Sequence, residues 1–417
     1  MRAMGRPSRF ATAAELGLMQ GSPPFAPERL VSLANWQDPP FNRWGFQHIR
    51  ELIPTARIAR GDGPVWRLPR EEEDRDLSGI EFRHGRRELT VERMLRETWT
   101  DGFLVLHWGR IVTERYFNGM TPDTPHLLMS VSKSITSTVA GILVGRGRLD
   151  PSAAVTEVLP ELRGTSFEGS SVQHLLDMRT GTKFDENYDD LEADARVYEQ
   201  VYLWRPRTNR RLPADACAYF AMLRNDGEHG GPFRYRSILT DVLGWVVERA
   251  GGARLAALIS RELWQPMGAE FDAEITVDAH GNAMADGGIC ATLRDLGRFG
   301  QLFANGGRRA GRRIVPAAWI RDTVRGAPDG ARAFVEGEPL EEFPPGAHYR
   351  NKWWVRDPSV PFFHGSGING QHVFVHVPSR TVVAKLSTWP VADRPELWAV
   401  TAAAALAISE ALASGRV

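Results

Sequence analysis

The chain has 417 residues, of which 42% are hydrophobic and 24% charged, and its 51 lysines and arginines balance 51 acidic residues. This composition is ordinary for a globular protein, and the zero net charge gives no field that would favour nucleic acid or an anionic membrane. Two cysteines cannot build a disulfide framework, no apolar leader core follows the N-terminal arginines, and the apolar run 397–408 is too short to span a bilayer. We therefore expect a cytoplasmic protein with no nucleic-acid or membrane partner.

The N-terminal part of the chain predicts three successive features. Residues 1–35 show little sign of packed structure and are expected to form a tail before a single domain, 36–417. Residues 36–44 are aromatic and interrupted by prolines, which favours an irregular segment that wraps the domain. Two apolar runs within 101–117 flank a Trp-Gly-Arg turn, which predicts a β-hairpin.

A strongly apolar helix is expected directly after Ser130. Apolar residues recur every four positions between 131 and 143, and Gly145 and Gly147 then end the pattern. A helix this apolar is buried, so Ser130 should lie at its N-terminal end, where the helix dipole favours developing negative charge.

Helical patterns dominate the middle of the chain, and strand patterns return toward its C-terminus. The helical segments are 171–178, 214–223, 240–250, 254–264, 292–304 and 316–324, and the later strands are 352–356, 371–377 and 381–387. A final amphipathic helix is expected over 396–413. Because strands come from both ends, we predict an α/β (α+β) fold. Its antiparallel sheet is built from N- and C-terminal segments and flanked by helices, with a mainly helical region, about 150–330, inserted.

Ser130 and Lys133 form a Ser-x-x-Lys motif at the start of the apolar helix. Residues three apart on a helix share a face, so the hydroxyl and the amine can meet, and an amine can activate a serine without histidine. A desolvated lysine can lose its proton whereas arginine cannot, and only four lysines stand among the basic residues. The motif arises by chance in most chains of this size, so its neighbours must support it.

Tyr235 is the second candidate. A tyrosine beside a serine–lysine pair can carry the proton between nucleophile and leaving group, provided that the Lys133 cation lowers its pKa from about 10. Packing in the core is the alternative role.

The glycine-rich segment 363–371 is the third candidate. Glycines before a strand let the backbone approach a substrate, and a backbone N–H there can pair with that of Ser130 in an oxyanion hole. A simple turn is the alternative. Ser366 lacks the Gly-x-Ser-x-Gly context of a nucleophile elbow, and His372 and His376 lack further ligands, so we predict no metal and no cofactor.

The order of these segments resembles the serine β-lactamase and penicillin-binding-protein superfamily, and within it the nylon-oligomer (6-aminohexanoate-dimer) hydrolases and their carboxylesterase relatives. The runs that carry the resemblance are 36–44, 126–134, 235–245, 286–288, 291–296 and 367–371. The resemblance implies Ser130 as the acyl-accepting nucleophile and Lys133 and Tyr235 as its activating pair. It also implies an oxyanion hole made by the N–H groups of Ser130 and Ile368.

The resemblance further implies substrate-binding residues. The loop 185–189 is similar to the lid of the family, in which a tyrosine closes over the substrate amide, so Tyr188 is a candidate. Asp286 falls where relatives place a polar substrate contact, and an aspartate there is a departure. The other candidates are Ser237, Gly367, Asn369 and Trp353, with Trp204 and Trp354 as further pocket walls.

One departure separates the branches of this superfamily. Penicillin-recognising members carry Lys-Thr-Gly where this chain has Gly365-Ser366-Gly367, so we expect hydrolysis of small-molecule esters or linear amides rather than β-lactam turnover. A β-lactamase or D-aminopeptidase-like enzyme and a catalytically silent binding protein on the same fold are the alternatives. Assembly as a homodimer stays open.

Overall fold

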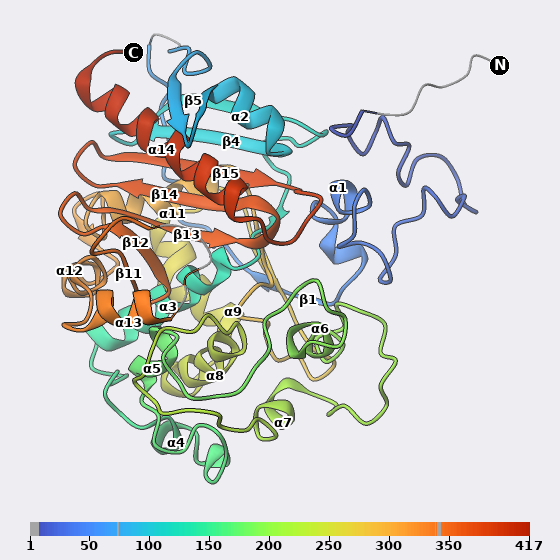
Figure 1. Cartoon of the computed structure of the whole chain (residues 1–417), viewed down its shortest axis with the longest axis vertical. Coiled ribbons are helices and arrows are strands. Elements are labelled where there is room, and N and C mark those ends of the chain that lie inside the picture. Colours follow the sequence, from blue (N-terminus) through green and yellow to red (C-terminus); the bar gives the residue numbers. More distant parts are fainter. Residues whose placement is uncertain (1–7, 73–74, 338, 340–342) are drawn as a thin grey trace.

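The computed structural model describes residues 8–72, 75–337, 339 and 343–417 (Figure 1). Its largest element is a seven-stranded antiparallel sheet in the order β11-β12-β13-β14-β15-β4-β5. The strands of this sheet are β4 (Thr100–His107), β5 (Arg110–Tyr116), β11 (His348–Arg350), β12 (Trp353–Asp357), β13 (Phe362–Gly367), β14 (Gln371–His376) and β15 (Thr381–Ser387). The N-terminal hairpin β4–β5 pairs with C-terminal β15, so the predicted sheet and the hairpin over 101–117 are confirmed.

Most of the helices lie in the middle of the chain, as predicted. The helices of the described residues are α1 (Asn42–Gly45), α2 (Val91–Glu97), α3 (Val131–Gly145), α4 (Val155–Val158), α5 (Val172–Leu176), α6 (Asp194–Tyr198), α7 (Ala216–Phe220), α8 (Ile238–Gly251), α9 (Leu255–Leu258), α10 (Gln265–Met267), α11 (Leu293–Ala304), α12 (Ala317–Arg325), α13 (Gly330–Glu336) and α14 (Pro395–Ser414). Shorter helical turns are η1 (Ile49–Glu51), η2 (Pro160–Leu162), η3 (Ile259–Trp264) and η4 (Ile368–Gly370). The six helices expected between 171 and 324 each have a counterpart, whereas six further helices were not predicted: α1, α2, α4, α6, α10 and α13.

Helices cover both faces of the large sheet. Along β4, Phe103 and Val105 pack into the core that contains α14, and Leu104 and Leu106 pack into the core that contains α3 and α11. This alternation is the two-residue period of a strand buried on both faces. Figure 1 shows α14 lying across one face, and contacts place α11 against β4, β14 and β15.

α3 can lie deep in the protein because its outer side carries glycines. A Cβ atom at Gly141 would lie 2.4 Å from the ring of Trp319, and one at Gly145 would lie 2.3 Å from Pro316. Side chains at either position would push away the start of α12. The two glycines therefore let α12 close over α3, which fixes the helix that begins after Ser130.

A second, smaller sheet corrects the expectation for the middle of the chain. Its order is β1-β7-β8-β6, and its strands are β1 (Thr55–Ile58), β6 (His126–Leu127), β7 (Ala273–Thr276) and β8 (Ile289–Ala291). Two separate hairpins join β2 (Glu81–His84) to β3 (Arg87–Thr90) and β9 (Arg308–Arg309) to β10 (Arg312–Arg313). β7 and β8 are short and wholly buried, so they show no alternation that would reveal a strand. β6 leads directly to Ser130, so this sheet anchors the chain ahead of α3.

The N-terminal segment packs more than predicted. Residues 8–35 form turns without a helix or strand, yet Leu18 and Val31 are buried in the main core. The short helix α1 also overlaps the end of the segment 36–44 that was expected to be irregular. Residues 1–7 lie outside the described part, and the division into a tail and one domain, 36–417, stays a prediction.

The helix predicted over 396–413 is α14, which is longer than the apolar run 397–408 that was expected to be too short to span a bilayer. Among the described helices it alone is long and apolar enough to cross a membrane by length and composition, and half of its apolar window is buried inside the protein. α14 packs against β2, α2, β14 and β15.

Candidate active site

The end of β6 and the start of α3 hold Ser130 and Lys133 together. The Lys133 ammonium donates a hydrogen bond to Ser130 Oγ at 2.7 Å, and both residues are buried. The residue before the serine, Met129, has a left-handed backbone with φ 46°. This backbone conformation is energetically unfavourable for residues other than glycine and is typical of turns at functional sites. Hydrogen bonds from Leu127 N to Phe46 O and from Leu128 N to Ile289 O hold the turn in place.

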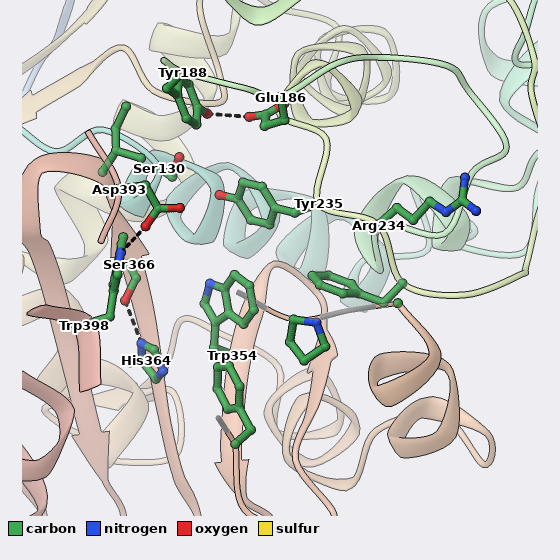
Figure 2. A pocket seen from close by; sticks show the side chains of 15 residues that line it. Ser130, Glu186, Tyr188, Arg234, Tyr235, Trp354, His364, Ser366, Asp393 and Trp398 are labelled. Atoms are coloured by element: carbon green, nitrogen blue, oxygen red, sulfur yellow. Dashed lines mark hydrogen bonds between the residues drawn. The ribbon is translucent and has the colours of Figure 1, made fainter. Parts of the chain in front are cut away.

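Tyr235 reaches the same point from the segment before α8. Figure 2 shows its hydroxyl pointing toward Ser130, and Lys133 Nζ lies 5.2 Å from the centre of its ring. The ring of Trp354 stacks on Tyr235 at 5.5 Å and fixes its orientation. Tyr235, which lies far along the sequence, thus meets the Ser130–Lys133 pair at one hydroxyl.

The pKa of Tyr235 differs from the expectation drawn from the sequence. Burial raises the pKa of Tyr235, and the Lys133 charge and a hydrogen bond with Ser130 offset only part of that effect. Burial alone would lower the pKa of Lys133, but the charges of Tyr235, Asp286 and other acidic groups outweigh it and raise that pKa. The expected lowering of the Tyr235 pKa is therefore wrong.

The end of β13 approaches the backbone of Ser130. A Cβ atom at Gly367 would lie 2.6 Å from Leu128 O and 2.8 Å from Ser130 N, so only glycine allows this contact. The next residue, Ile368, begins η4 and lines the same cavity as Ser130. The segment expected to precede a strand is thus itself strand β13 followed by a turn. Its position beside Ser130 fits the predicted pairing of two backbone N–H groups.

A cavity of about 260 Å³ opens beside Ser130 and Tyr235 (Figure 2). Aromatic rings form much of its wall, and a few polar side chains complete it. In addition to Tyr235, the aromatic lining residues are Tyr188, Phe233, Phe343, Trp354 and Trp398. In addition to Ser130, the polar lining residues are Glu186, Arg234, His364, Ser366 and Asp393. A concave, mostly apolar site with convergent polar groups is typical of a small-molecule pocket.

Comparison with known proteins decides the family. The β-lactamase family model matches residues 91–406. The chain is also 37% identical over 381 residues to the 6-aminohexanoate-dimer hydrolase of Paenarthrobacter ureafaciens, an alignment that covers 91% of this chain and 94% of that relative. The chain belongs to the β-lactamase family. It is a serine hydrolase, which confirms the resemblance noted from its motifs.

Other proteins similar to this chain support the same family assignment and fold. Esterase EstB of Burkholderia gladioli is 35% identical over 161 residues, which cover 36% of this chain and 38% of that relative. A solved Bacillus anthracis protein, provisionally named a 6-aminohexanoate-dimer hydrolase, has a TM-score of 0.82 at 25% identity and covers 92% of this chain and 97% of its own. The solved family VIII carboxylesterase has a TM-score of 0.54 at 18% identity, covers 72% of this chain and 91% of its own, and shares the fold. The predicted β-lactamase-like fold is confirmed.

A glutamate that the sequence analysis did not single out holds the loop 185–189 against this β-lactamase-family site. The Glu186 carboxylate accepts hydrogen bonds from the Tyr188 hydroxyl and from both the backbone N–H, at 2.9 Å, and the hydroxyl of Ser237. Burial raises the pKa of Glu186, and the charge of Lys133 opposes this effect. Tyr188 and Ser237 thus stay candidates for substrate binding. In the sequence, the feature that could have pointed to Glu186 is its position two residues before the candidate tyrosine, Tyr188.

Asp286 lies behind Lys133. Its Oδ2 is 3.6 Å from Lys133 Nζ, and its carbonyl oxygen accepts a hydrogen bond from the same ammonium at 3.0 Å. Its backbone N–H donates to Asp241 Oδ1 at 3.0 Å. Burial and the charge of Asp286 raise the pKa of Asp241 far above its usual value. These contacts indicate a role in setting the charge of Lys133, and the predicted contact of Asp286 with substrate stays untested.

Of the six predicted substrate-binding residues, Tyr188 lines the cavity beside Ser130 and Tyr235, and five do not: Ser237, Asp286, Gly367, Asn369 and Trp353. Trp353 is buried against Phe303 and Phe363, whereas its neighbour Trp354 forms the cavity wall, because successive residues of strand β12 face opposite sides. The Asn369 amide donates to the carbonyl oxygens of Trp389 and Val391 at 2.9 and 3.1 Å. The structure therefore gives Trp353 a core position, and Asn369 braces the loop after β15.

Neutral groups occupy the position of the Lys-Thr-Gly motif. Ser366 Oγ lies 2.7 Å from His364 Nδ1 and 3.0 Å from His372 Nδ1, and burial lowers the pKa of both histidines well below its usual value. A Cβ atom at Gly365 would lie 2.8 Å from Ser134 Oγ, which leaves no room for a lysine there. Within the ranges that the structure describes, no group of three or more His, Cys, Asp or Glu side chains is arranged to hold a metal ion.

Proposed function

We propose that the protein hydrolyses carboxylic esters or linear amides through an acyl-enzyme on Ser130. The observation that carries this proposal is the 2.7 Å hydrogen bond between Lys133 Nζ and Ser130 Oγ, with the Tyr235 hydroxyl facing the same atom in the cavity wall. The names of the two curated relatives, an amide-cleaving hydrolase of a linear dimer and an esterase, support both substrate classes.

The proposed reaction has two halves. In the enzyme form whose Lys133–Tyr235 pair has lost one proton, Ser130 Oγ attacks the carbonyl carbon and its proton passes to that pair. The N–H groups of Ser130 and Ile368 bind the oxyanion. Tyr235 then delivers the proton to the leaving oxygen or nitrogen, and water releases the acid by the same steps. Lys133 and Tyr235 titrate as a coupled pair, so either can take the first proton.

The absence of a charged side chain on strand β13 at the position of Lys-Thr-Gly supports esters and linear amides, rather than β-lactams, as substrates. A lysine that would bind the carboxylate of a penicillin has no room at Gly365, and the histidines around Ser366 carry no charge at neutral pH. We also propose a cytoplasmic location, a small-molecule substrate and a reaction without metal or cofactor. Assembly as a homodimer stays a prediction.

The nucleophile is tested by a fluorophosphonate probe and intact-mass measurement. We expect one adduct on the native protein and none on Ser130→Ala; an equal adduct on the variant would contradict the assignment. The same label also tests the silent-binding alternative, since a protein without catalysis should not acylate.

The branch is tested by comparing p-nitrophenyl butyrate, the 6-aminohexanoate dimer and nitrocefin on one preparation. We expect the ester or the linear amide to be the best substrate, and nitrocefin as the best of the three would overturn the choice.

A further inference from the structure

Ser130 lies between two cavities of very different size. The larger, of about 260 Å³, is the aromatic cavity described above. The smaller cavity, of about 30 Å³, is lined by apolar and aromatic side chains together with a few polar ones, among them Phe184, Tyr198, Trp204, Met284, Glu199, Ser237 and Asp286. Ser130, Tyr188 and Ile368 line both cavities, so a carbonyl group bound at Ser130 can extend one arm into each.

The position of Tyr235 indicates which of the two cavities holds the leaving group. Tyr235 lines the larger cavity and is absent from the lining of the smaller one. Of the two arms of an ester or amide, the leaving oxygen or nitrogen must receive a proton as its bond to the carbonyl carbon breaks. Because the Tyr235 hydroxyl faces Ser130 from the wall of the larger cavity and delivers that proton in the proposed reaction, the arm in the larger cavity is the leaving group. The acyl arm then enters the smaller cavity.

The walls of the smaller cavity are firmly held. Trp204 Nε1 donates to Thr276 Oγ1 at 3.0 Å, and the ring of Trp36 packs against it edge-on at 5.2 Å. Phe184 packs edge-on against Tyr198 at 6.2 Å. The volume of this cavity is about 30 Å³, against about 260 Å³ for the larger one, so it suits the shorter and less bulky of the two arms.

The walls of the larger cavity suit a flat apolar group. Trp354 stacks on Tyr235 at 5.5 Å and on Phe343 at 5.6 Å, and Phe233 packs edge-on against Trp354 at 5.6 Å. Rings offset in this way leave faces and edges on which another ring can pack.

We infer that the preferred substrates are esters or amides with a short acyl group and a bulky, ring-bearing alcohol or amine as leaving group. This inference rests on the proposed function. The bond from Ser130 Oγ to the carbonyl carbon forms, and the bond from that carbon to the leaving oxygen or nitrogen breaks. The Ser130 proton reaches the leaving atom through the Lys133–Tyr235 pair, and water then splits the short acyl-enzyme.

Two isomeric esters test the inference. 2-Phenylethyl acetate carries its ring on the leaving group, and ethyl phenylacetate carries it on the acyl group, while both release an alkyl alcohol. We expect kcat/KM to be at least tenfold higher for 2-phenylethyl acetate. Equal values, or the reverse order, would overturn the assignment of the cavities.

The fluorophosphonate adduct separates this failure from failure of the proposed function. An enzyme that forms the adduct on Ser130 but shows no preference between the isomers retains the proposed function and refutes the inference. An enzyme that forms no adduct refutes the proposed function itself.

A matched pair of variants gives a second test. Phe184→Ala enlarges the smaller cavity and should shift the ratio of the two kcat/KM values at least fivefold toward ethyl phenylacetate. Phe343→Ala removes a similar ring from the larger cavity and should not shift the ratio in that direction. Because both esters compete in one sample, loss of folded enzyme cancels from the ratio. An equal shift in both variants would contradict the inference.

Discussion

Ser130 and Tyr188 line the same cavity but are held there by different forces. Ser130 follows a buried strand and precedes a buried helix, and Gly367 packs against its backbone N–H. Tyr188 lies on a loop, 185–189, that forms no helix or strand, and the Glu186 carboxylate ties this loop to Ser237. The nucleophile is thus fixed by the core, whereas the substrate-facing tyrosine depends on one side chain. We therefore expect changes near Ser130 to alter the rate of chemistry and changes near Glu186 to alter binding.

The largest effect is expected from Lys133→Arg, which tests the chemical half of this comparison. Arginine keeps the positive charge but cannot lose its proton, so kcat/KM for p-nitrophenyl butyrate should fall roughly 10³-fold. The exposed Lys183 provides the matched control, and Lys183→Arg should stay within a factor of two. An active Lys133→Arg enzyme would remove the amine from proton transfer.

Tyr235→Phe should have the next largest effect. The ring and its stacking on Trp354 remain, but the proton donor to the leaving group is lost, so kcat should fall about 10²-fold. Tyr349→Phe removes the hydroxyl of a neighbouring buried tyrosine and should change kcat much less. Similar losses in both variants would indicate packing as the role of Tyr235.

The same contrast explains how much of the site the sequence could predict. Ser130 and Lys133 are three residues apart on one helix, so their contact follows from local geometry alone. The hairpin β4–β5 was equally local, whereas its pairing with β15 joins segments from opposite ends of the chain. Glu186 acts through the path of a loop, which no periodic pattern encodes.

The errors have specific physical causes. Trp353 and Trp354 differ by one position in a strand, and that single step decides between core and cavity. Asn369 has a left-handed φ of 58°, which turns its amide toward the loop after β15 rather than toward substrate. The pKa of Tyr235 depends on burial that only the folded chain reveals.

Glu186→Gln tests the binding half of the comparison. A neutral amide accepts fewer hydrogen bonds, and bonds to a charged group contribute roughly 1.5–3 kcal/mol, so the loop should loosen and KM should rise about tenfold. kcat should change less, because the contact between Lys133 and Ser130 remains. Asp189→Asn removes an exposed carboxylate from the same loop and should leave KM within a factor of two. A fall in kcat at unchanged KM would place Glu186 in the chemistry instead.

Asp286→Asn should have the smallest effect, and it shows whether the Ser130 region also depends on a carboxylate. The active form needs the Lys133–Tyr235 pair to lose a proton, so kcat/KM rises with pH through the pKa of that pair. Burial lowers the pKa of Lys133, and the Asp286 charge, 3.6 Å away, helps to raise it. Removing that charge destabilises the ammonium, so the midpoint of the rising limb should move to lower pH. Asp286→Glu keeps the charge and should stay closer to the native midpoint. A midpoint that moves upward, or equal shifts in both variants, would show that Asp286 does not set this charge. The expected shift, with KM unchanged, would show that Asp286 acts through the protonation of Lys133.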